Sequence, residues 1–192
     1  MTYPAPADPS GDPRYTSARY FALVDEGVLS PDDRVELLEG VIVAMAPQSP
    51  THGGAASVVA EVLRRALEGR AAVREDKPLV LGTYWVPEPD VAIVPGHLGD
   101  YRGAHPTTAL LVVEVADSSL PQDRITKARM YAAAGIAEYW IVNLRDNRLE
   151  IFRDPDVRTR GYATSAVAGR AERLHLVALP GVSVSTDHLL PG

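Results

Sequence analysis

The stretch Ala-Leu-Leu-Val-Val-Glu-Val-Ala, residues 109–116, decides the fold class of this 192-residue chain. Seven of its eight residues are apolar and do not alternate with polar ones, which is typical of a strand buried on both faces of a sheet. A helical pattern over residues 122–134, ended by Gly135, follows it. The sequence therefore predicts an α/β domain in which helices cover the central strands of a mixed sheet.

The segments on either side of this stretch predict further short elements. On the N-terminal side we expect a short helix from Thr16 or Ser17 to Asp25, a β-hairpin over residues 34–38 and 41–45, and a helix over residues 55–68. Strands are expected at residues 71–81, 84–85 and 90–94, a surface loop at 96–107, a second hairpin at 138–144 and 148–153, and weaker strands at 162–167 and 173–179. Together these elements predict one domain over residues 15–192, preceded by a flexible, proline-rich segment over residues 1–14.

Composition excludes several classes of protein. The chain has no cysteine, which removes disulfide scaffolds, thiol nucleophiles and zinc sites built on thiolates, and which fits a reducing compartment. No apolar run reaches the length of a membrane span, and the N-terminus lacks the pattern of a signal peptide, so we expect a cytoplasmic protein without membrane contact. The net charge of −6 argues against a generic basic coat on nucleic acid, although eight acids against three arginines in residues 1–40 supply most of it.

Glu114 is the unusual residue of the central strand. An ionised carboxylate there costs several kcal/mol of desolvation unless a cation or hydrogen-bond donors meet it. Two interpretations stay open from the residues alone: a strand-end glutamate that points into solvent or pairs with an arginine, and a functional carboxylate.

Asp90 opens the strand at 90–94, after Pro89. By itself it is a common turn residue. On neighbouring strands, however, Asp90 and Glu114 come within about 5 Å of each other, because strands lie about 4.8 Å apart. Two carboxylates at that distance repel, and a divalent cation reverses the sign of the interaction; oxygen-only ligands without cysteine favour Mg²⁺ or Mn²⁺ over zinc.

Lys127 is one of only two lysines in the chain and lies on the helix that follows Glu114. If this helix starts near Gln122, Lys127 lies about 8 Å along it, and its side chain reaches back toward the carboxylates. The alternative is a surface ion pair with Asp123 at i,i+4, worth only about 0.3–0.5 kcal/mol.

Six short motifs then fall in one order. They are Glu36-Leu37-Leu38-Glu39-Gly40, Pro50-Thr51-His52, Pro89-Asp90-Val91, Val113-Glu114-Val115, Asp123 with Lys127, and Gly135 with Glu138-Tyr139-Trp140-Ile141-Val142. In this order and spacing they resemble the large bacterial Uma-two family of restriction-endonuclease-like proteins, within the PD-(D/E)XK nuclease superfamily, over about residues 15 to 190. The resemblance implies a restriction-endonuclease-like core: a central mixed four-stranded sheet flanked by helices, here with additional β-hairpins, and an active site at one edge.

The resemblance also implies roles. Asp90 and Glu114 match metal ligands, and the backbone carbonyl of Val115 is a third candidate ligand for Mg²⁺, which Mn²⁺ can replace. The superfamily lysine would fall on Ala116, and its role passes to Lys127. Glu39 matches an acidic position of the family's hairpin that touches the metal directly or through water.

His52 matches a family histidine that positions a phosphate or donates a proton, while a capping role remains equally open. Two positions depart from the family pattern without being candidate ligands: Asp117 stands for the usual serine and Asn143 for the usual aspartate.

These residues predict a metal-dependent endonuclease acting on DNA, with Arg124, Arg129 and Arg74 as candidates to hold flanking phosphates. A homodimer would suit an enzyme that cuts both strands. Trp140 and Tyr139 are expected in the core, and Trp85, beside Tyr84, is a better candidate to touch substrate. Two alternatives stay open: a nuclease-like fold that binds nucleic acid or protein with little or no cleavage, and a metal-dependent hydrolase of small phosphoesters.

Overall fold

The computed structural model describes residues 12–30 and 32–191. Most of the segment expected to be flexible, residues 1–11, thus lies outside the described residues. Of its described part, the Arg14 guanidinium lies 4.0 Å from the centre of the Tyr84 ring and pairs with Asp12.

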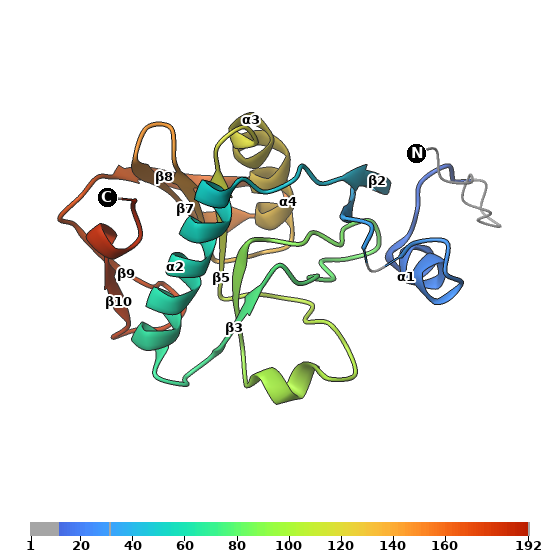
Figure 1. Ribbon diagram of the computed structural model, residues 1–192, viewed down its shortest axis with the longest axis horizontal. Coiled ribbons are helices and arrows are strands. Elements are labelled where there is room, and N and C mark those ends of the chain that lie inside the picture. The colour runs from blue at the N-terminus through green and yellow to red at the C-terminus, as the bar shows by residue number, and fades with distance from the viewer. Residues whose placement is uncertain (1–11, 31, 192) are drawn as a thin grey trace.

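A six-stranded mixed sheet forms the body of the molecule (Figure 1). Its strands, in spatial order, are β3 (Ala72–Glu75), β4 (Val91–Val94), β5 (Leu111–Ala116), β6 (Glu138–Asn143), β7 (Arg148–Asp156) and β8 (Gly161–Ala168). All neighbours are antiparallel except β5 and β6, which are parallel. The sheet is wider than the expected four strands because the hairpin β7–β8 extends it beyond β6.

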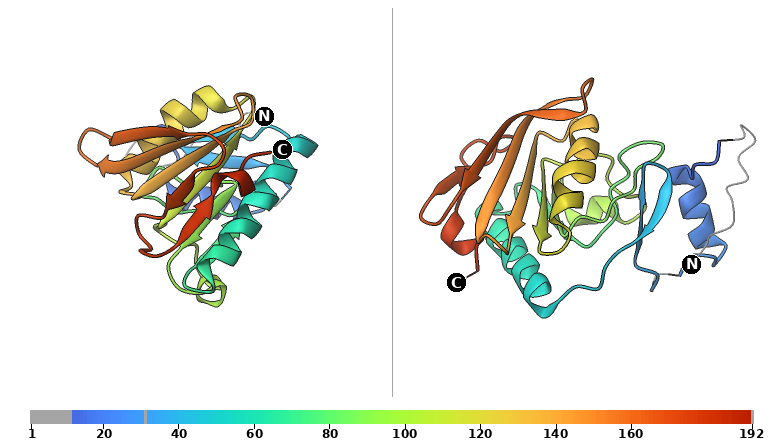
Figure 2. Two further views of the ribbon diagram at one scale, coloured as in Figure 1. Left: turned by 90° about the vertical axis from the view of Figure 1, so that its left-hand side faces the viewer. Right: turned by 90° about the horizontal axis from the view of Figure 1, so that it is seen from above.

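Helices cover both faces of the sheet (Figure 2). Side chains alternate between the faces of a strand, so Val113 and Val115 of β5 join the core beneath helix α2 (Pro50–Leu67), whereas Val112 and Ala116 join the core beneath the opposite helices. The predicted central strand is therefore buried on both faces, as its unbroken apolar pattern indicated. Glu114 shares its face with Val112 and Ala116.

Helix α2 begins five residues earlier than expected. The Ser49 side chain accepts a hydrogen bond from the His52 N–H, and Pro50 occupies the first helical turn, where its missing N–H costs nothing. Pro50, Gly53 and Gly54 thus lie inside the helix, ahead of the start expected from the sequence. The N-cap, rather than the glycine pair, sets the helix start.

The crossover from β5 to β6 is one helical segment over residues 120–133. It consists of α3 (Leu120–Gln122), a π-helical turn (Asp123–Lys127) and α4 (Ala128–Ala133), and Gly135 ends it at φ 71°. In the π turn the Ala128 N–H bonds to the Asp123 carbonyl, five residues back. This wider turn buries both Asp123 and Lys127 on the sheet side.

Two smaller units flank the body. Helix α1 (Ser17–Asp25) and the hairpin β1 (Val35–Leu38) and β2 (Val41–Ala44) share a hydrophobic cluster of their own at one end of the molecule (Figures 1 and 2). The hairpin of β9 (Arg173–His175) and β10 (Ser183–Ser185) belongs to the core beneath α2. The chain also forms two 3-10 turns, Leu98–Tyr101 and Thr186–His188. Within the described residues, no helix is both long and apolar enough to cross a membrane.

Candidate active site

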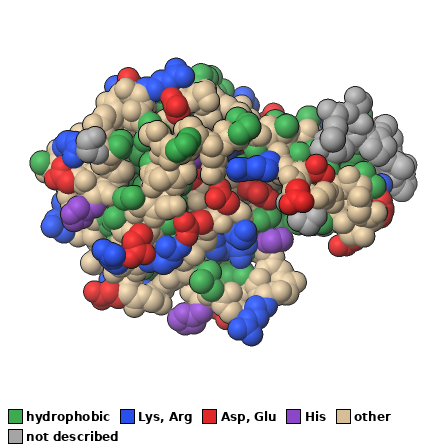
Figure 3. Space-filling view, in the orientation of Figure 1, with side chains coloured by type: hydrophobic (Ala, Val, Ile, Leu, Met, Phe, Trp, Pro, Cys, Tyr) green, Lys and Arg blue, Asp and Glu red, His purple; other side chains and the backbone are tan. Residues whose placement is uncertain are grey.

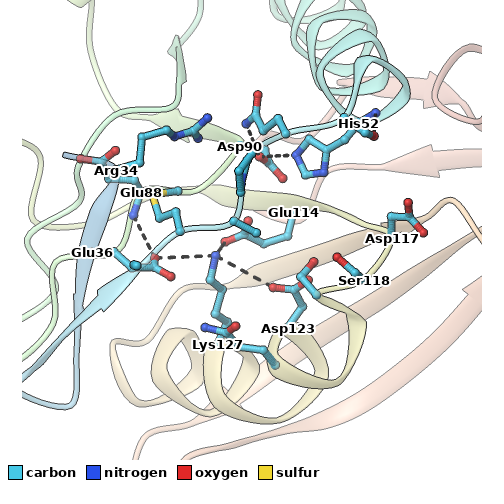
Figure 4. A pocket seen from close by; sticks show the side chains of 18 residues that line it. Arg34, Glu36, His52, Glu88, Asp90, Glu114, Asp117, Ser118, Asp123 and Lys127 are labelled. Atoms are coloured by element: carbon cyan, nitrogen blue, oxygen red, sulfur yellow. Dashed lines mark hydrogen bonds and ion pairs between the residues drawn. The ribbon is translucent and has the colours of Figure 1, made fainter. Parts of the chain in front are cut away.

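A cavity of about 150 Å³ opens where β1–β2, the start of α2, β4, β5 and the crossover helix meet (Figure 4). Its charged and imidazole side chains are Arg34, Glu36, His52, Glu88, Asp90, Glu114, Asp117, Asp123 and Lys127. Six of these nine are acidic, so the cavity holds more negative than positive charge.

Asp90 lies one residue before β4 and is buried. Val91 pairs with Val113, so extending this register by one residue sets Asp90 opposite Glu114. The Asp90 Oδ2 atom accepts the Val115 N–H at 2.7 Å, and its Oδ1 atom lies 2.9 Å from His52 Nε2. The β4–β5 register therefore brings Asp90, Glu114 and Val115 together, and the capped start of α2 adds His52.

Glu114 is buried and contacts the crossover helix. Its Oε1 atom accepts hydrogen bonds from Lys127 Nζ at 3.0 Å and from the Tyr131 hydroxyl at 2.7 Å. Glu114 thus neither points into solvent nor pairs with an arginine. Lys127 reaches back from the helix to the carboxylate, as predicted.

Lys127 is surrounded by acids. Besides Glu114, its Nζ atom lies 3.7 Å from Glu36 Oε2 and 3.9 Å from Asp123 Oδ1. The pair with Asp123 exists, but it is buried rather than on the surface. The Oδ2 atom of Asp123 is buried and has no hydrogen-bond partner among the described residues.

The pKa values follow from burial and charge. Burial, reinforced by neighbouring carboxylates, raises the pKa of Glu114, and Lys127 opposes this rise. Burial works to lower the pKa of Lys127, but Glu114, Glu36 and Asp123 outweigh it and raise that pKa, so the ammonium stays charged. The hydrogen bond to Asp90 raises the pKa of His52.

Glu39 lies away from this cluster. It occupies the two-residue turn between β1 and β2, where Glu39 and Gly40 have φ values of 52° and 82°, the two positive angles of a type I′ turn. The turn exposes Glu39 to solvent, and it does not line the cavity. Glu36, three residues earlier, reaches Lys127 instead.

The candidate phosphate-binding arginines do not line the cavity either. Arg124 forms two hydrogen bonds with Glu150 on β7, Arg129 is exposed, and Arg74 is buried in β3. The cation that does line the cavity beside Lys127 is Arg34.

The structure also shows where the candidate aromatic residues lie, and what the two residues that depart from the family pattern contact. Trp140 and Tyr139 are fully buried, which confirms them as core residues, and Trp85 is half-buried outside the cavity. Asp117 pairs with Arg145 at the surface, and Asn143 donates to Glu150 and Asp146.

Three residues of the site were not singled out from the sequence as site residues: Glu36, Asp123 and Tyr131. Asp123, Lys127 and Tyr131 recur every four residues, which puts them on one stripe of the crossover helix. Glu36 lies in the apolar strand Val35-Glu36-Leu37-Leu38, where a buried charge requires a partner just as Glu114 does. Both signals were present in the sequence.

The donor set suits a hard divalent cation. Mg²⁺ prefers oxygen ligands and is usually bound by one or two carboxylates together with waters and substrate phosphate. Asp90 and Glu114 supply two carboxylates, and the Asp123 Oδ2 atom, which has no hydrogen-bond partner among the described residues, lies nearby. Within the described part of the chain, no three or more histidine, aspartate or glutamate side chains come together in a group that could hold a metal ion, so an ion here would rely on the two carboxylates together with backbone, water and substrate oxygens.

A mixed sheet covered by helices on both faces, with carboxylates gathered at the ends of adjoining strands, defines a restriction-endonuclease-like α/β fold. The chain belongs to the Uma2 family, described as "Putative restriction endonuclease", whose model matches residues 18–187. Among solved structures, it is similar to a crystal structure described as "a putative nuclease belonging to DUF820 from Anabaena variabilis ATCC 29413". That match has 14% identity and a TM-score of 0.67 over 91% of this chain and 96% of that chain. No curated protein matches the chain. The predicted family and fold class are therefore confirmed.

Proposed function

We propose that this protein is a metal-dependent endonuclease that hydrolyses phosphodiester bonds of DNA. The observation that carries the proposal is the pair of buried carboxylates, Asp90 and Glu114, on adjoining strands, with Lys127 in contact with Glu114. A buried acidic cluster of this kind destabilises a fold, so its presence in a cavity argues for a functional role.

Asp90 and Glu114 would hold the ion, with the Val115 carbonyl as a third ligand. In a strand, the N–H and C=O of one residue point to the same neighbouring strand. Since the Val115 N–H bonds to Asp90, we expect its carbonyl on that side as well. Bound Mg²⁺ supplies polarisation of the phosphate and a bound water of lowered pKa.

The remaining side chains hold and balance charge. Lys127 offsets part of the negative charge of Glu114, Glu36 and Asp123, and its ammonium can stabilise charge that develops on a phosphate. His52 fixes one oxygen of Asp90 and lies at the cavity wall, where it can donate a proton to phosphate. Without a bound cation, the excess of acidic side chains in the cavity repels a phosphate. This repulsion favours a reaction that requires a cation.

The size of the cavity favours a polymeric substrate over a small phosphoester. Pockets that enclose a small-molecule ligand usually measure about 300–1,000 Å³. At about 150 Å³, this cavity has room for an ion, waters and one phosphate, while the rest of the substrate stays outside. A cytoplasmic location and a homodimer that cuts both strands complete the proposal.

The test is cleavage of plasmid DNA and of labelled single strands with Mg²⁺ or Mn²⁺, with EDTA lanes as controls. We expect cleavage by the wild type and its loss, by at least a hundredfold, in Asp90→Asn and Glu114→Gln, with circular dichroism showing that both variants fold. Calorimetric titration with Mn²⁺ should show heat that depends on Asp90. A folded wild type that cuts no DNA and shows no Mn²⁺ heat dependent on Asp90 would transfer the assignment to a binding protein, whereas Mn²⁺ binding at Asp90 with cleavage of nucleotides alone would favour a hydrolase of small phosphoesters. Cleavage at the wild-type rate by either variant would remove the proposed metal site.

A further inference from the structure

Arg74, on the edge strand β3, is a buried cation without an anion. Its side chain is only 8% exposed, and its Nε atom has no hydrogen-bond partner among the described residues. One terminal nitrogen lies 3.2 Å from His105 Nδ1, and the guanidinium carbon lies 5.4 Å from the centre of the Tyr101 ring. None of these contacts neutralises its charge.

The two carboxylates that follow Arg74 in the sequence are engaged elsewhere. Glu75 pairs with Arg64 of α2, and Asp76 accepts a hydrogen bond from Gln48. Within the described residues, Arg74 forms no ion pair. A guanidinium withdrawn from water without a carboxylate is costly to the fold, and such a cost indicates a missing anionic partner.

His105, which contacts Arg74, lies in the field of two cations. Burial lowers the pKa of His105, and the charges of Arg74 and Lys77 lower it further, so the imidazole is neutral and its Nδ1 atom accepts from Arg74. The His105 ring is stacked on Phe21 of α1 at 5.4 Å between ring centres, which fixes its position. A guanidinium that is held in place and keeps one N–H without a partner is a suitable donor for an oxyanion.

Arg74 lies on the same face of the sheet as the candidate active site. It pairs with Ala92 of β4, and cross-strand partners share a face; Asp90, two residues before Ala92, shares that face too. From strand spacing and rise, the Cα atoms of Arg74 and Asp90 are about 8 Å apart. In Figure 3, Lys, Arg and His side chains lie beside the acidic side chains at the centre of the face.

We infer that Arg74, positioned by His105 and Tyr101, binds a phosphate oxyanion, and that this phosphate belongs to a nucleic-acid strand lying across the site at Asp90. The inference deepens the proposed function and rests on it for the source of the phosphate. Arg74 is a substrate-binding residue in this scheme, and it lies outside the carboxylate and lysine cluster that would perform the cleavage.

The experiment compares the wild type with Arg74→Met, which keeps an apolar stem against Tyr101, and with Arg158→Met, which removes an equal charge from the exposed β7–β8 turn. The first readout is the melting temperature with and without inorganic phosphate, in EDTA. The second is the affinity of a labelled oligonucleotide in EDTA, measured by fluorescence anisotropy over a range of salt concentrations. Neither readout requires cleavage.

We expect phosphate to raise the melting temperature of the wild type and of Arg158→Met but not of Arg74→Met. Without phosphate, Arg74→Met should melt at or above the wild-type temperature, because it removes an unpaired buried charge. Oligonucleotide affinity should fall about tenfold in Arg74→Met, and the slope of log affinity against log salt should decrease by about one.

Each outcome separates the two proposals. A phosphate shift that requires Arg74, without any change in oligonucleotide affinity, supports the oxyanion site with free phosphate as its ligand. Equal behaviour of wild type and Arg74→Met in both readouts overturns the inference, whether or not the protein cuts DNA. Conversely, a wild type that does not cleave DNA would overturn the proposed function, whereas the phosphate-dependent shift in melting temperature would still test the role of Arg74.

Discussion

At the scale of single residues, Lys127 holds the buried charges of the cavity together. Its ammonium is within 4 Å of Glu114, Glu36 and Asp123, which come from β5, β1 and the crossover helix. Removing one partner of a buried ionic group typically costs about 3–5 kcal/mol, because the remaining charges lose their compensation. Lys127 therefore serves the fold as well as the proposed chemistry, and variants at this position have to be tested for folding before their activity is interpreted.

Tyr131 carries a sharper prediction. Burial, and then the charge of Glu114, raise the pKa of its phenol, so it stays protonated and donates to Glu114. We expect Tyr131→Phe to lower the free energy of unfolding by about 1.5–3 kcal/mol, as for a hydrogen bond to a charged group. Tyr139→Phe is the matched control, since Tyr139 is equally buried but donates to the neutral Asp123 carbonyl, and should lose only about 1 kcal/mol. Urea unfolding at pH 7 measures both, and equal losses would show that Glu114 is not held as a carboxylate.

At the scale of elements, polar side chains of the crossover helix anchor it to the sheet at two points. Lys127 and Tyr131 bind it to β5, while Arg124 binds it to Glu150 of β7 through two hydrogen bonds. The hydrogen bonds from Arg124, and then from Asn143, hold the pKa of Glu150 below its usual value. The second anchor therefore depends on pH.

The sign of this dependence follows from the lowered pKa. Glu150 binds its proton more weakly in the folded state, so its stabilising contribution is complete above its unfolded pKa of about 4.3 and is lost as the pH falls through its lower folded value. We expect Glu150→Gln to be less stable than the wild type at pH 7 and the difference to shrink below about pH 4. Urea unfolding of both proteins at pH 7, 5 and 3.5 measures it. A difference that stays constant across this range would assign the loss to packing rather than to charge.

The sequence predicted those elements whose local signals agree with their environment. The apolar run around Glu114 gave a buried strand, and the Asp90–Glu114 pair followed from strand spacing. The π turn could not be predicted, because the wider winding at Asp123 depends on burial of its side chain against the sheet. Likewise, the family resemblance indicated Glu39 as the acidic site residue of the hairpin. The turn exposes Glu39 to solvent, however, and the buried partner of Lys127 is Glu36. Tertiary contacts decided both cases, although the apolar strand around Glu36 did indicate that its carboxylate needs a buried partner.

At the scale of the whole molecule, the N-terminal unit is held to the body by hydrogen bonds to residues 83–86, by the Phe21–His105 stack and by Leu38, which are fewer contacts than the central strands make with one another. Helix α1 and the β1–β2 hairpin have their own hydrophobic cluster, and Leu37 bridges to Val86 outside the six-stranded sheet. A two-stranded hairpin is marginally stable by itself, so this unit depends on its docking to the body. It nevertheless contributes Glu36 to the cavity.

We therefore expect the N-terminal unit to open more readily than the sheet. In hydrogen exchange followed by mass spectrometry, amides of β1 and β2 should exchange at least tenfold faster than those of β5 and β6, since local opening requires less free energy where few contacts are lost. The N-terminal helix α1 should exchange together with the hairpin. Equal protection of β1 and β5 would instead mean that the two parts unfold as one unit.

The distance in sequence between Glu36 and Lys127 has a consequence for synthesis of the protein. About 90 residues separate them, so at 5–20 residues per second the ribosome takes roughly 5–20 s to add the lysine after the glutamate. Throughout that interval the hairpin carries an acidic side chain whose buried position is not yet neutralised. We therefore expect the nascent hairpin to gain its final docked position only after the crossover helix has left the exit tunnel.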